Sequence, residues 1–191
     1  PLVLGIPRGG VVTGAVLARE LNADLDVALS RKLRHPLQPE LAIGAISEDG
    51  HVHIDARFRD SGLDGDYLQQ ESQRRMAELD QRRKMFRSIR PAAEITGRSV
   101  ILTDDGIATG STMFAALQLV KAKQPRETIV AVPVAPPTCF DRFRQECDEA
   151  IALILPQGFM AVGQFYEEFA QVDDEQVCEA LREFAPSGTR P

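Results

Sequence analysis

Short apolar runs alternate along the chain with segments in which apolar residues recur at helical spacing. This alternation is typical of β-α-β units, in which a buried parallel strand is followed by a helix that covers it. The pattern predicts strands at residues 2–6, 25–29, 41–46, 99–103, 128–134 and 150–155, and helices at residues 11–21, 112–122, 138–147 and 173–184. We therefore expect an α/β fold with a central, mainly parallel sheet flanked by helices.

Two stretches between these elements follow other patterns. Residues 52–54 predict a short antiparallel partner for the strand at 41–46, because an Asp-Gly pair between them favours a turn. The stretch Arg31–Glu40 carries two prolines among charged residues, which predicts an irregular surface loop.

The segment at residues 64–88 is long, polar and free of Gly and Pro after Gly65. Acidic residues precede basic residues by four positions, which stabilises a helix, and a narrow apolar stripe runs along one side. The pairs are Glu71–Arg75, Glu78–Arg82 and Asp80–Lys84, and the stripe is Leu68, Met76, Leu79 and Phe86. We predict an exposed helical insertion laid over the domain. A solvated helix, a partner or lid helix, and a basic surface for an anion or nucleic acid are the alternatives for its role.

The composition is that of one ordinary globular domain. We assign residues 1–185 of the 191 to it, with a frayed tail at 186–191. The 22 basic and 28 acidic residues give a net charge of −6, which argues against a general nucleic-acid binder but leaves room for a local basic pocket. No apolar run approaches the ~20 residues of a membrane helix. The three cysteines form no Cys-x-x-Cys pair, so we expect reduced thiols in a cytoplasmic protein.

The chain start, the histidines and the cysteines add little chemistry. The chain opens at Pro1 inside a predicted strand, without a Met or a basic leader, so we expect no signal peptide and a further segment upstream. His51 and His53 share one strand face, but the absence of a third ligand at metal-binding spacing disfavours a metal site. Cys147 and Cys178 have no base partner and are interpreted as buried, inert thiols.

The segment after the predicted strand at 99–103 carries the most informative pattern, an acid pair followed by a loop of glycines and hydroxyl residues that leads into a helix. Its residues are Asp104, Asp105, Gly106, Ile107, Ala108, Thr109, Gly110, Ser111 and Thr112. Open α/β sheets bind ligands at the carboxyl ends of their strands, where this segment would lie. The acids suit sugar hydroxyls, directly or beside a Mg²⁺ ion, and the amides at the helix start suit a phosphate monoester. A plain turn followed by a helix cap is the alternative, while the Walker A and dinucleotide glycine motifs are absent.

This segment resembles the motif with which type I phosphoribosyltransferases bind phosphoribosyl pyrophosphate (PRPP). The resemblance implies the Rossmann-like fold of that family. It also implies that Asp104 and Asp105 hold the ribose hydroxyls and that residues 106–112 wrap the 5-phosphate.

The resemblance extends to the segment after the first predicted strand, which matches the family's pyrophosphate loop. The matching residues are Pro7, Arg8, Gly9 and Gly10. In the family this loop often contains a cis peptide bond, and its glycines let the backbone approach the ligand. Arg31 and Lys32 open the stretch that would serve as the loop closing over PRPP, and they are assigned to the pyrophosphate as well. An ordinary strand-to-helix turn and a solvated surface loop are the alternatives.

The resemblance implies an enzyme that depends on PRPP and Mg²⁺. Such an enzyme transfers the 5-phosphoribosyl group to a nitrogen acceptor, such as a nucleobase, and releases pyrophosphate. Arg8 and Lys32 would stabilise the departing negative charge, and together with the acid pair they are the candidate catalytic residues. The sequence is most similar to a bacterial group of the family with unassigned substrate, and the family implies nucleotide metabolism and a homodimer.

One position departs from the family pattern. In the 6-oxopurine members, an Asp that acts on the purine stands where this chain has Ala108, although orotate-type members also lack an acid there. Phe159, Phe165 and Tyr166 lie in a stretch that is faintly similar to the purine-stacking region of the oxopurine enzymes. They are candidates for stacking on a base, with packing in the core as the alternative.

Two other functions stay open at this point. The first is a domain that senses PRPP or a nucleotide without turnover, whose arginine-rich helix at 74–90 would contact RNA or a partner protein. The second is one module of a larger enzyme, in which the acceptor chemistry is supplied elsewhere.

Overall fold

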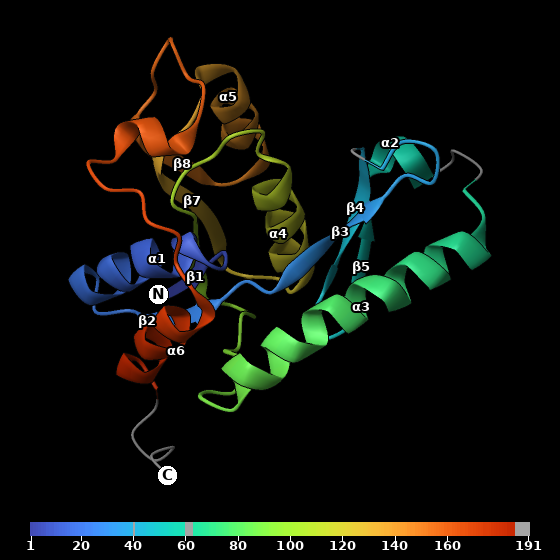
Figure 1. Cartoon of the computed structure of the whole chain (residues 1–191), viewed down its shortest axis with the longest axis horizontal. Coiled ribbons are helices and arrows are strands. Elements are labelled where there is room, and N and C mark those ends of the chain that lie inside the picture. Colours follow the sequence, from blue (N-terminus) through green and yellow to red (C-terminus); the bar gives the residue numbers. More distant parts are fainter. Residues whose placement is uncertain (40, 60–62, 186–191) are drawn as a thin grey trace.

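The computed structural model describes residues 1–39, 41–59 and 63–185. Its centre is a five-stranded parallel sheet with the strand order β2-β1-β6-β7-β8 (Figure 1). The strands are β1 (Leu2–Gly5), β2 (Asp24–Val27), β6 (Ser99–Thr103), β7 (Glu127–Val134) and β8 (Glu149–Ile154). The prediction of an α/β fold around a mainly parallel sheet is confirmed. The tail predicted at 186–191 lies outside the described residues.

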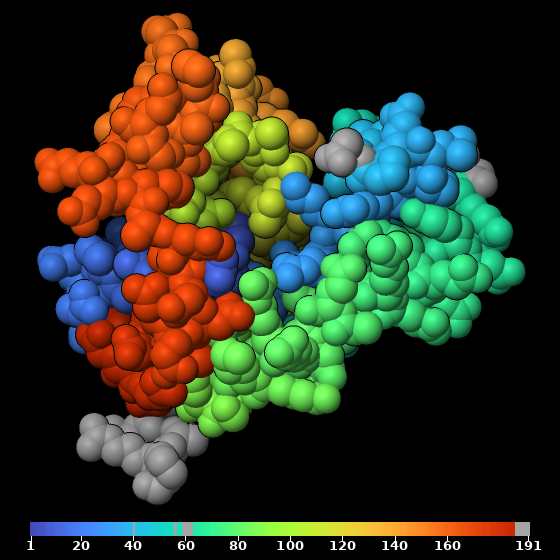
Figure 2. Space-filling model, viewed as in Figure 1, coloured from blue at the N-terminus to red at the C-terminus, as the bar shows by residue number. Residues whose placement is uncertain are grey.

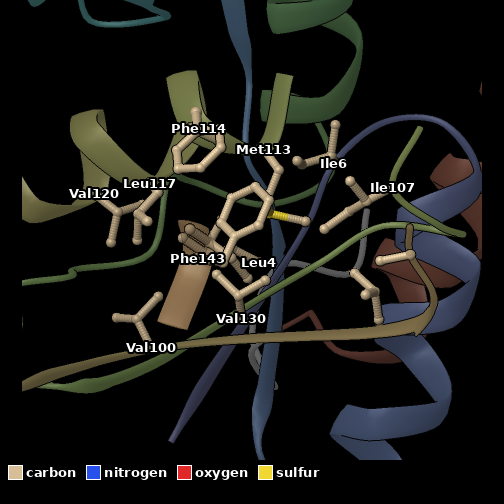
Figure 3. Close-up of a cluster of buried hydrophobic side chains, with 14 of the residues drawn as sticks. Leu4, Ile6, Val100, Ile107, Met113, Phe114, Leu117, Val120, Val130 and Phe143 are labelled. Atoms are coloured by element: carbon tan, nitrogen blue, oxygen red, sulfur yellow. The ribbon is translucent and has the colours of Figure 1, made fainter. Parts of the chain in front are cut away.

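Helices cover both faces of this sheet, as right-handed crossovers require. They are α1 (Gly9–Glu20), α4 (Ser111–Ala122), α5 (Pro137–Glu146) and α6 (Asp174–Glu183), and a short 3₁₀ turn, η1, spans Val162–Phe165. Val3 of β1 packs in a buried cluster with residues of α1 and α6. Its neighbour Leu4 points the other way and packs with residues of α4 and α5. Figure 3 shows this second cluster, in which the rings of Phe114 and Phe143 stack with their centroids 3.9 Å apart.

A separate antiparallel sheet, which we call the accessory sheet, stands beside this core (Figure 1). Its strands are β3 (Ser30–Arg34), β4 (Ala42–Ser47) and β5 (Val52–Ile54), in that spatial order, and a short helix α2 (Ala56–Arg59) follows. The antiparallel pairing predicted for residues 52–54 is confirmed. β3 and β4 contact α4, so the accessory sheet packs against the helix that follows the acid-pair loop.

The loop predicted for Arg31–Glu40 is wrong at its start, because residues 31–34 belong to β3. The strand was not predicted because three of these four side chains are basic. Leu33 alone among them is fully buried, whereas Arg31 and Lys32 are half-buried. A single apolar residue among cations carries no detectable alternation, so the pairing with β4 determines the conformation. Position 40 lies outside the described residues.

α3 (Gly65–Arg87) confirms the helix predicted at 64–88. Asp64 caps it, because its carboxylate accepts the Asp66 backbone N–H at 3.0 Å. The helix is less exposed than predicted. Phe86 is fully buried, and Glu71 and Arg75 form a buried ion pair with their atoms 2.7 Å apart.

The ion pairs of α3 agree only in part with the predicted ones. Glu71 pairs with Arg75 and Asp80 with Lys84, both at 2.7 Å, as predicted. Glu78 was predicted to pair with Arg82 but pairs with Arg75 at 2.8 Å. Arg82 reaches Asp174 of α6 at 3.2 Å. α3 therefore connects the accessory sheet to α6, and Figure 1 shows it running beside that sheet with its C-terminal end towards α6. In the described part of the chain, no helix is long and apolar enough to cross a membrane.

Candidate active site

Two of the predicted motifs meet at the carboxyl edge of the central sheet. β1 and β6 are paired with Gly5 beside Thr103. The next residue, Ile6, donates its backbone N–H to the Thr103 carbonyl at 2.9 Å. The loops that follow β1 and β6 therefore leave the sheet side by side. Figure 2 shows a hollow in the surface here, between the orange segment after β8 and the blue and green residues of the accessory sheet and α3.

The two loops touch, and Gly9 and Gly10 make the contact possible. A Cβ atom on Gly9 would lie 2.0 Å from Asp105 Oδ2. A Cβ atom on Gly10 would lie 2.7 Å from the Cα atom of Asp104. A side chain at either position would therefore displace part of the acid pair.

The segment before these glycines leads directly into a helix. The peptide bond between Pro7 and Arg8 is cis, as the family resemblance implies. α1 begins directly afterwards, at Gly9, with Arg8 at its N-cap and half-buried. The first backbone amides of a helix lack partners within the helix and attract negative charge.

Asp104 and Asp105 hold two carboxylates in a poorly solvated place. The Asp105 backbone N–H donates to Asp104 Oδ1 at 2.9 Å, and the amide of Gly10 also interacts with that carboxylate. Burial, reinforced by the charge of Asp105, raises the pKa of Asp104 well above its usual range. Burial raises the pKa of Asp105 as well. Such a pair gains stability from a cation or from hydroxyl groups that donate to it.

Residues 106–112 form a loop that is anchored on its inner side. Ile107 is buried and donates its backbone N–H to the Val134 carbonyl at 2.9 Å. Gly110 has a φ of +75°, and a Cβ atom there would lie 2.5 Å from Cys139 Sγ. Glycine is therefore required at this position for both its conformation and its size.

The outer side of the same loop presents donors. Ala108, Thr109 and Thr112 are exposed. The Thr109 and Ser111 hydroxyl oxygens lie 3.0 Å apart. Because α4 begins at Ser111, its free backbone amides lie next to these hydroxyls. Hydroxyls and helix-start amides together suit a phosphate group.

Lys32 reaches this loop from the accessory sheet. Its ammonium group donates to Ser111 Oγ, across 79 positions of sequence. A cavity of about 290 Å³ lies beside it, between β3, α3 and the start of α4. The charged residues of the cavity lining are Arg31, Lys32, Arg34, Arg75 and Glu78. Burial, and then the charge of Arg82, lowers the pKa of Arg31, while Glu78 acts in the opposite direction.

The three aromatic candidates for base stacking occupy different environments. The Tyr166 hydroxyl donates to the backbone carbonyl of Asp105 at 2.6 Å. Its ring packs against that of Phe169, with the centroids 5.1 Å apart. Phe159 and Phe165 stack on each other at 5.8 Å, and both are half-buried. Tyr166 is therefore tied to the acid-pair loop, whereas Phe159 and Phe165 form a pair of their own.

A model of the phosphoribosyl transferase domain matches residues 1–152 of this sequence. The chain belongs to the phosphoribosyl transferase family. Two curated Mycobacterium tuberculosis proteins, from strains CDC 1551 and H37Rv, carry the provisional name phosphoribosyl transferase and are 42% identical to it over 192 residues. The match covers 98% of this phosphoribosyl transferase chain and 43% of each relative. The chain thus spans less than half the length of these curated relatives.

The fold is shared with a solved protein as well. The crystal structure of TT1426 from Thermus thermophilus is 44% identical and superposes with a TM-score of 0.92. The match covers 97% of this phosphoribosyl transferase chain and 88% of TT1426. Membership of a family of transferase enzymes, which the motifs predicted, is therefore confirmed.

The site of this phosphoribosyl transferase chain fits a Mg²⁺ ion that is held partly by its ligand. No group of three or more His, Cys, Asp or Glu side chains is placed to hold a metal among residues 1–39, 41–59 and 63–185. The acid pair offers two carboxylates that burial deprives of water. Mg²⁺ commonly takes one or two carboxylates together with phosphate oxygens and waters. Asp104 and Asp105 therefore suit an ion that arrives with a phosphate-bearing ligand.

The sequence motifs predicted both loops of this phosphoribosyl transferase chain. Two contacts between these loops and distant elements were not predicted from the sequence. The charge of Lys32 indicated an anion, yet its partner Ser111 lies on a distant element. Nothing in the sequence indicated that the Tyr166 hydroxyl bonds to Asp105, because the two residues are 61 positions apart and no local pattern links them.

Proposed function

We propose that this chain binds PRPP together with Mg²⁺, transfers the 5-phosphoribosyl group to a nitrogen acceptor and releases pyrophosphate. The observation that carries the proposal is the contact between the two loops at one sheet edge. It places the glycines of the first loop against the carboxylates of the second. Acids for a sugar therefore lie between two sets of donors for phosphates.

In this proposal the acid pair orients the ribose. Asp104 and Asp105 accept hydrogen bonds from its hydroxyl groups, which relieves the cost of burying two carboxylates. The amides and hydroxyls of residues 106–112 bind the 5-phosphate at the start of α4. The two ends of the phosphoribosyl group are thus held by one continuous segment.

The leaving group occupies the first loop. The amides around Gly9 and Gly10, together with Arg8 and Arg31, hold the pyrophosphate. The start of α1 adds the positive end of its helix dipole. A bound Mg²⁺ ion supplies further positive charge for the departing phosphates.

The reaction is a displacement at the anomeric carbon. The bond from this carbon to the pyrophosphate oxygen breaks, and a bond to the acceptor nitrogen forms. Positive charge develops on the ribose ring, and the carboxylates of Asp104 and Asp105 stabilise it. Ala108 has no group that takes a proton, so the acceptor loses its proton without help from that position.

The proposal extends to the acceptor and the setting. Phe159 and Phe165, in the segment after β8, are the candidates for stacking on a flat acceptor such as a nucleobase. The proposed protein is a cytoplasmic homodimer of nucleotide metabolism, with residues 1–185 as one domain and α3 as its insertion. The length of the curated relatives favours a second form, in which this domain supplies the donor site of a longer enzyme.

Thermal unfolding with Mg²⁺, with and without saturating PRPP, tests the proposal. PRPP at a hundred times its Kd should stabilise the protein by about 2.7 kcal/mol, or roughly 5–10 °C for a domain of this size. Asp104→Asn/Asp105→Asn should lose the shift, whereas Asp141→Asn on the exposed face of α5 should keep it. A parent protein that shows no shift with PRPP would contradict the proposal. Release of pyrophosphate with a panel of bases then identifies the acceptor.

A further inference from the structure

The loop that would hold the 5-phosphate contains no basic residue of its own. Residues 106–112 are glycines, hydroxyl residues, Ile107 and Ala108. A phosphate monoester carries a charge of about −1.5 to −2 near pH 7. The hydroxyls of the loop are neutral, and the start of α4 contributes about half of one positive charge. The remaining charge must be balanced from another element.

Lys32 reaches the loop directly, whereas Arg57 and Arg142 line a separate cavity beside Thr109 and Ser111. The Lys32 ammonium group donates to Ser111 Oγ, and this oxygen lies 3.0 Å from Thr109 Oγ1. A full positive charge is therefore placed against the two hydroxyls that face the phosphate position. The ammonium group also lies where α4 begins, so it adds to the helix dipole.

The accessory sheet fixes Lys32 in this position. Lys32 pairs with Ala45 of β4, and its neighbour Leu33 is fully buried. The backbone that carries the ammonium group is thus held in a strand. A charge fixed in advance binds an anion with a smaller loss of conformational entropy than a charge on a free loop.

The surroundings of Lys32 add to the positive potential. In the adjoining cavity of about 290 Å³, the lining contains Arg31 and Arg34 in addition to Lys32. Arg75 also lines it, but two acids, Glu71 and Glu78, pair with that guanidinium. Arg31 also lies 3.9 Å from Glu78, and the described lining still holds more basic than acidic side chains.

We propose that Lys32 recognises the dianionic 5-phosphate and makes the site specific for a ribose that is phosphorylated at this position. This inference rests on the proposed function, because it assigns a role within the same site. It moves Lys32 from the pyrophosphate, where the sequence placed it, to the opposite end of the donor. The accessory sheet thereby becomes part of the donor site through one ammonium group.

Two partial ligands separate the two ends of the donor. Ribose 5-phosphate occupies only the 5-phosphate end, and pyrophosphate with Mg²⁺ occupies only the leaving-group end. Calorimetry should show that Lys32→Gln weakens ribose 5-phosphate binding by roughly 10- to 100-fold, the range for loss of a charged hydrogen bond. The same variant should bind pyrophosphate within about twofold of the parent, which also shows that it is folded.

Two further variants control for the charge itself. Lys32→Arg keeps the positive charge and should restore most of the affinity for ribose 5-phosphate. Lys84→Gln removes the same charge from the exposed face of α3, where Lys84 pairs with Asp80, and should behave as the parent.

The outcomes distinguish this inference from the proposed function. If Lys32→Gln loses pyrophosphate but keeps ribose 5-phosphate, the inference is wrong and the proposed function stands. Equal losses by Lys32→Arg and Lys32→Gln would also overturn it, because the charge would then not matter. If the parent binds neither PRPP nor ribose 5-phosphate, the proposed function fails, and the inference fails with it.

Discussion

The acid pair at the sheet edge and the ion pairs of α3 both hold poorly solvated charges, but among the described residues only the second set is paired with cations. Arg87 of α3 lies 2.7 Å from Asp26 and also binds Glu48, and these side chains are only 16%, 3% and 14% exposed, respectively. Asp104 and Asp105 lie side by side with raised pKa values. Buried charges that are paired hold elements together, whereas adjacent carboxylates without a cation mark a place for a ligand.

The strongest test of the comparison removes the cation from the paired region. Arg87→Met would leave Asp26 and Glu48 buried next to each other, so we expect a loss of about 3–5 kcal/mol in the free energy of unfolding. Urea unfolding followed by circular dichroism measures it. Arg144→Met removes an exposed partner of Asp141 and should cost less than about 1 kcal/mol. Equal losses in the two variants would show that burial does not determine how much these ion pairs contribute to the free energy of unfolding.

The next test concerns the contact between the loops. In Gly10→Ala the new methyl group would meet the backbone of Asp104, which cannot move aside, and we expect a loss of about 1–3 kcal/mol in stability. In Gly9→Ala the methyl group meets the end of the Asp105 side chain, which can rotate away. Gly9→Ala should therefore remain nearly as stable as the parent but lose PRPP binding. Thermal unfolding with and without PRPP measures both effects, and a reversed order of the two stabilities would contradict them.

A third test neutralises half of the acid pair. Because the pKa of Asp104 is higher in the folded than in the unfolded chain, its ionisation destabilises the fold as pH rises above about 4. Asp104→Asn should therefore raise the stability of the ligand-free protein by about 1–2 kcal/mol at pH 8. The gain should vanish near pH 4, where the parent carboxyl is protonated. Thermal midpoints measured in EDTA across this range test it, and a gain that is independent of pH would contradict this account.

The smallest effect is expected at the bond that ties the acid-pair loop to the segment after β8. Tyr166→Phe removes the hydroxyl that donates to the Asp105 carbonyl and should cost about 0.5–1.5 kcal/mol in stability. A loosened acid-pair loop should also weaken PRPP binding. The matched control is Tyr67→Phe. It removes a hydroxyl of α3 that donates to the Arg34 carbonyl of β3. Equal weakening of PRPP binding in both variants would show that the tie to Asp105 is not special.

The two regions also differ in how far the sequence predicted them. The central sheet and its loops were predictable because β6 carries three consecutive apolar residues and because the acid pair, glycines and hydroxyls follow it directly. Each loop is a local pattern with a local chemical meaning. Their meeting followed from parallel strands, which end at the same edge of a sheet.

The accessory region was predicted less well because its signals are not local. β3 is basic apart from Leu33 and gains its conformation from β4. The charge pattern of α3 predicts an exposed Glu71–Arg75 pair, although both side chains are buried against the accessory sheet, where the Arg34 backbone N–H donates to Glu71. The exposure of a charged helix depends on which elements pack against it. The spacing of charges along the helix gives no information about those elements.

The tie between Tyr166 and Asp105 has a consequence for the order in which the protein is made. The domain model ends at residue 152, before this tyrosine. During synthesis, β1, β6 and both loops leave the ribosome before Tyr166, whose hydroxyl donates to the Asp105 carbonyl. The strands of the central sheet all precede Tyr166 in the chain, so the acid-pair loop can gain this contact only after they have been made.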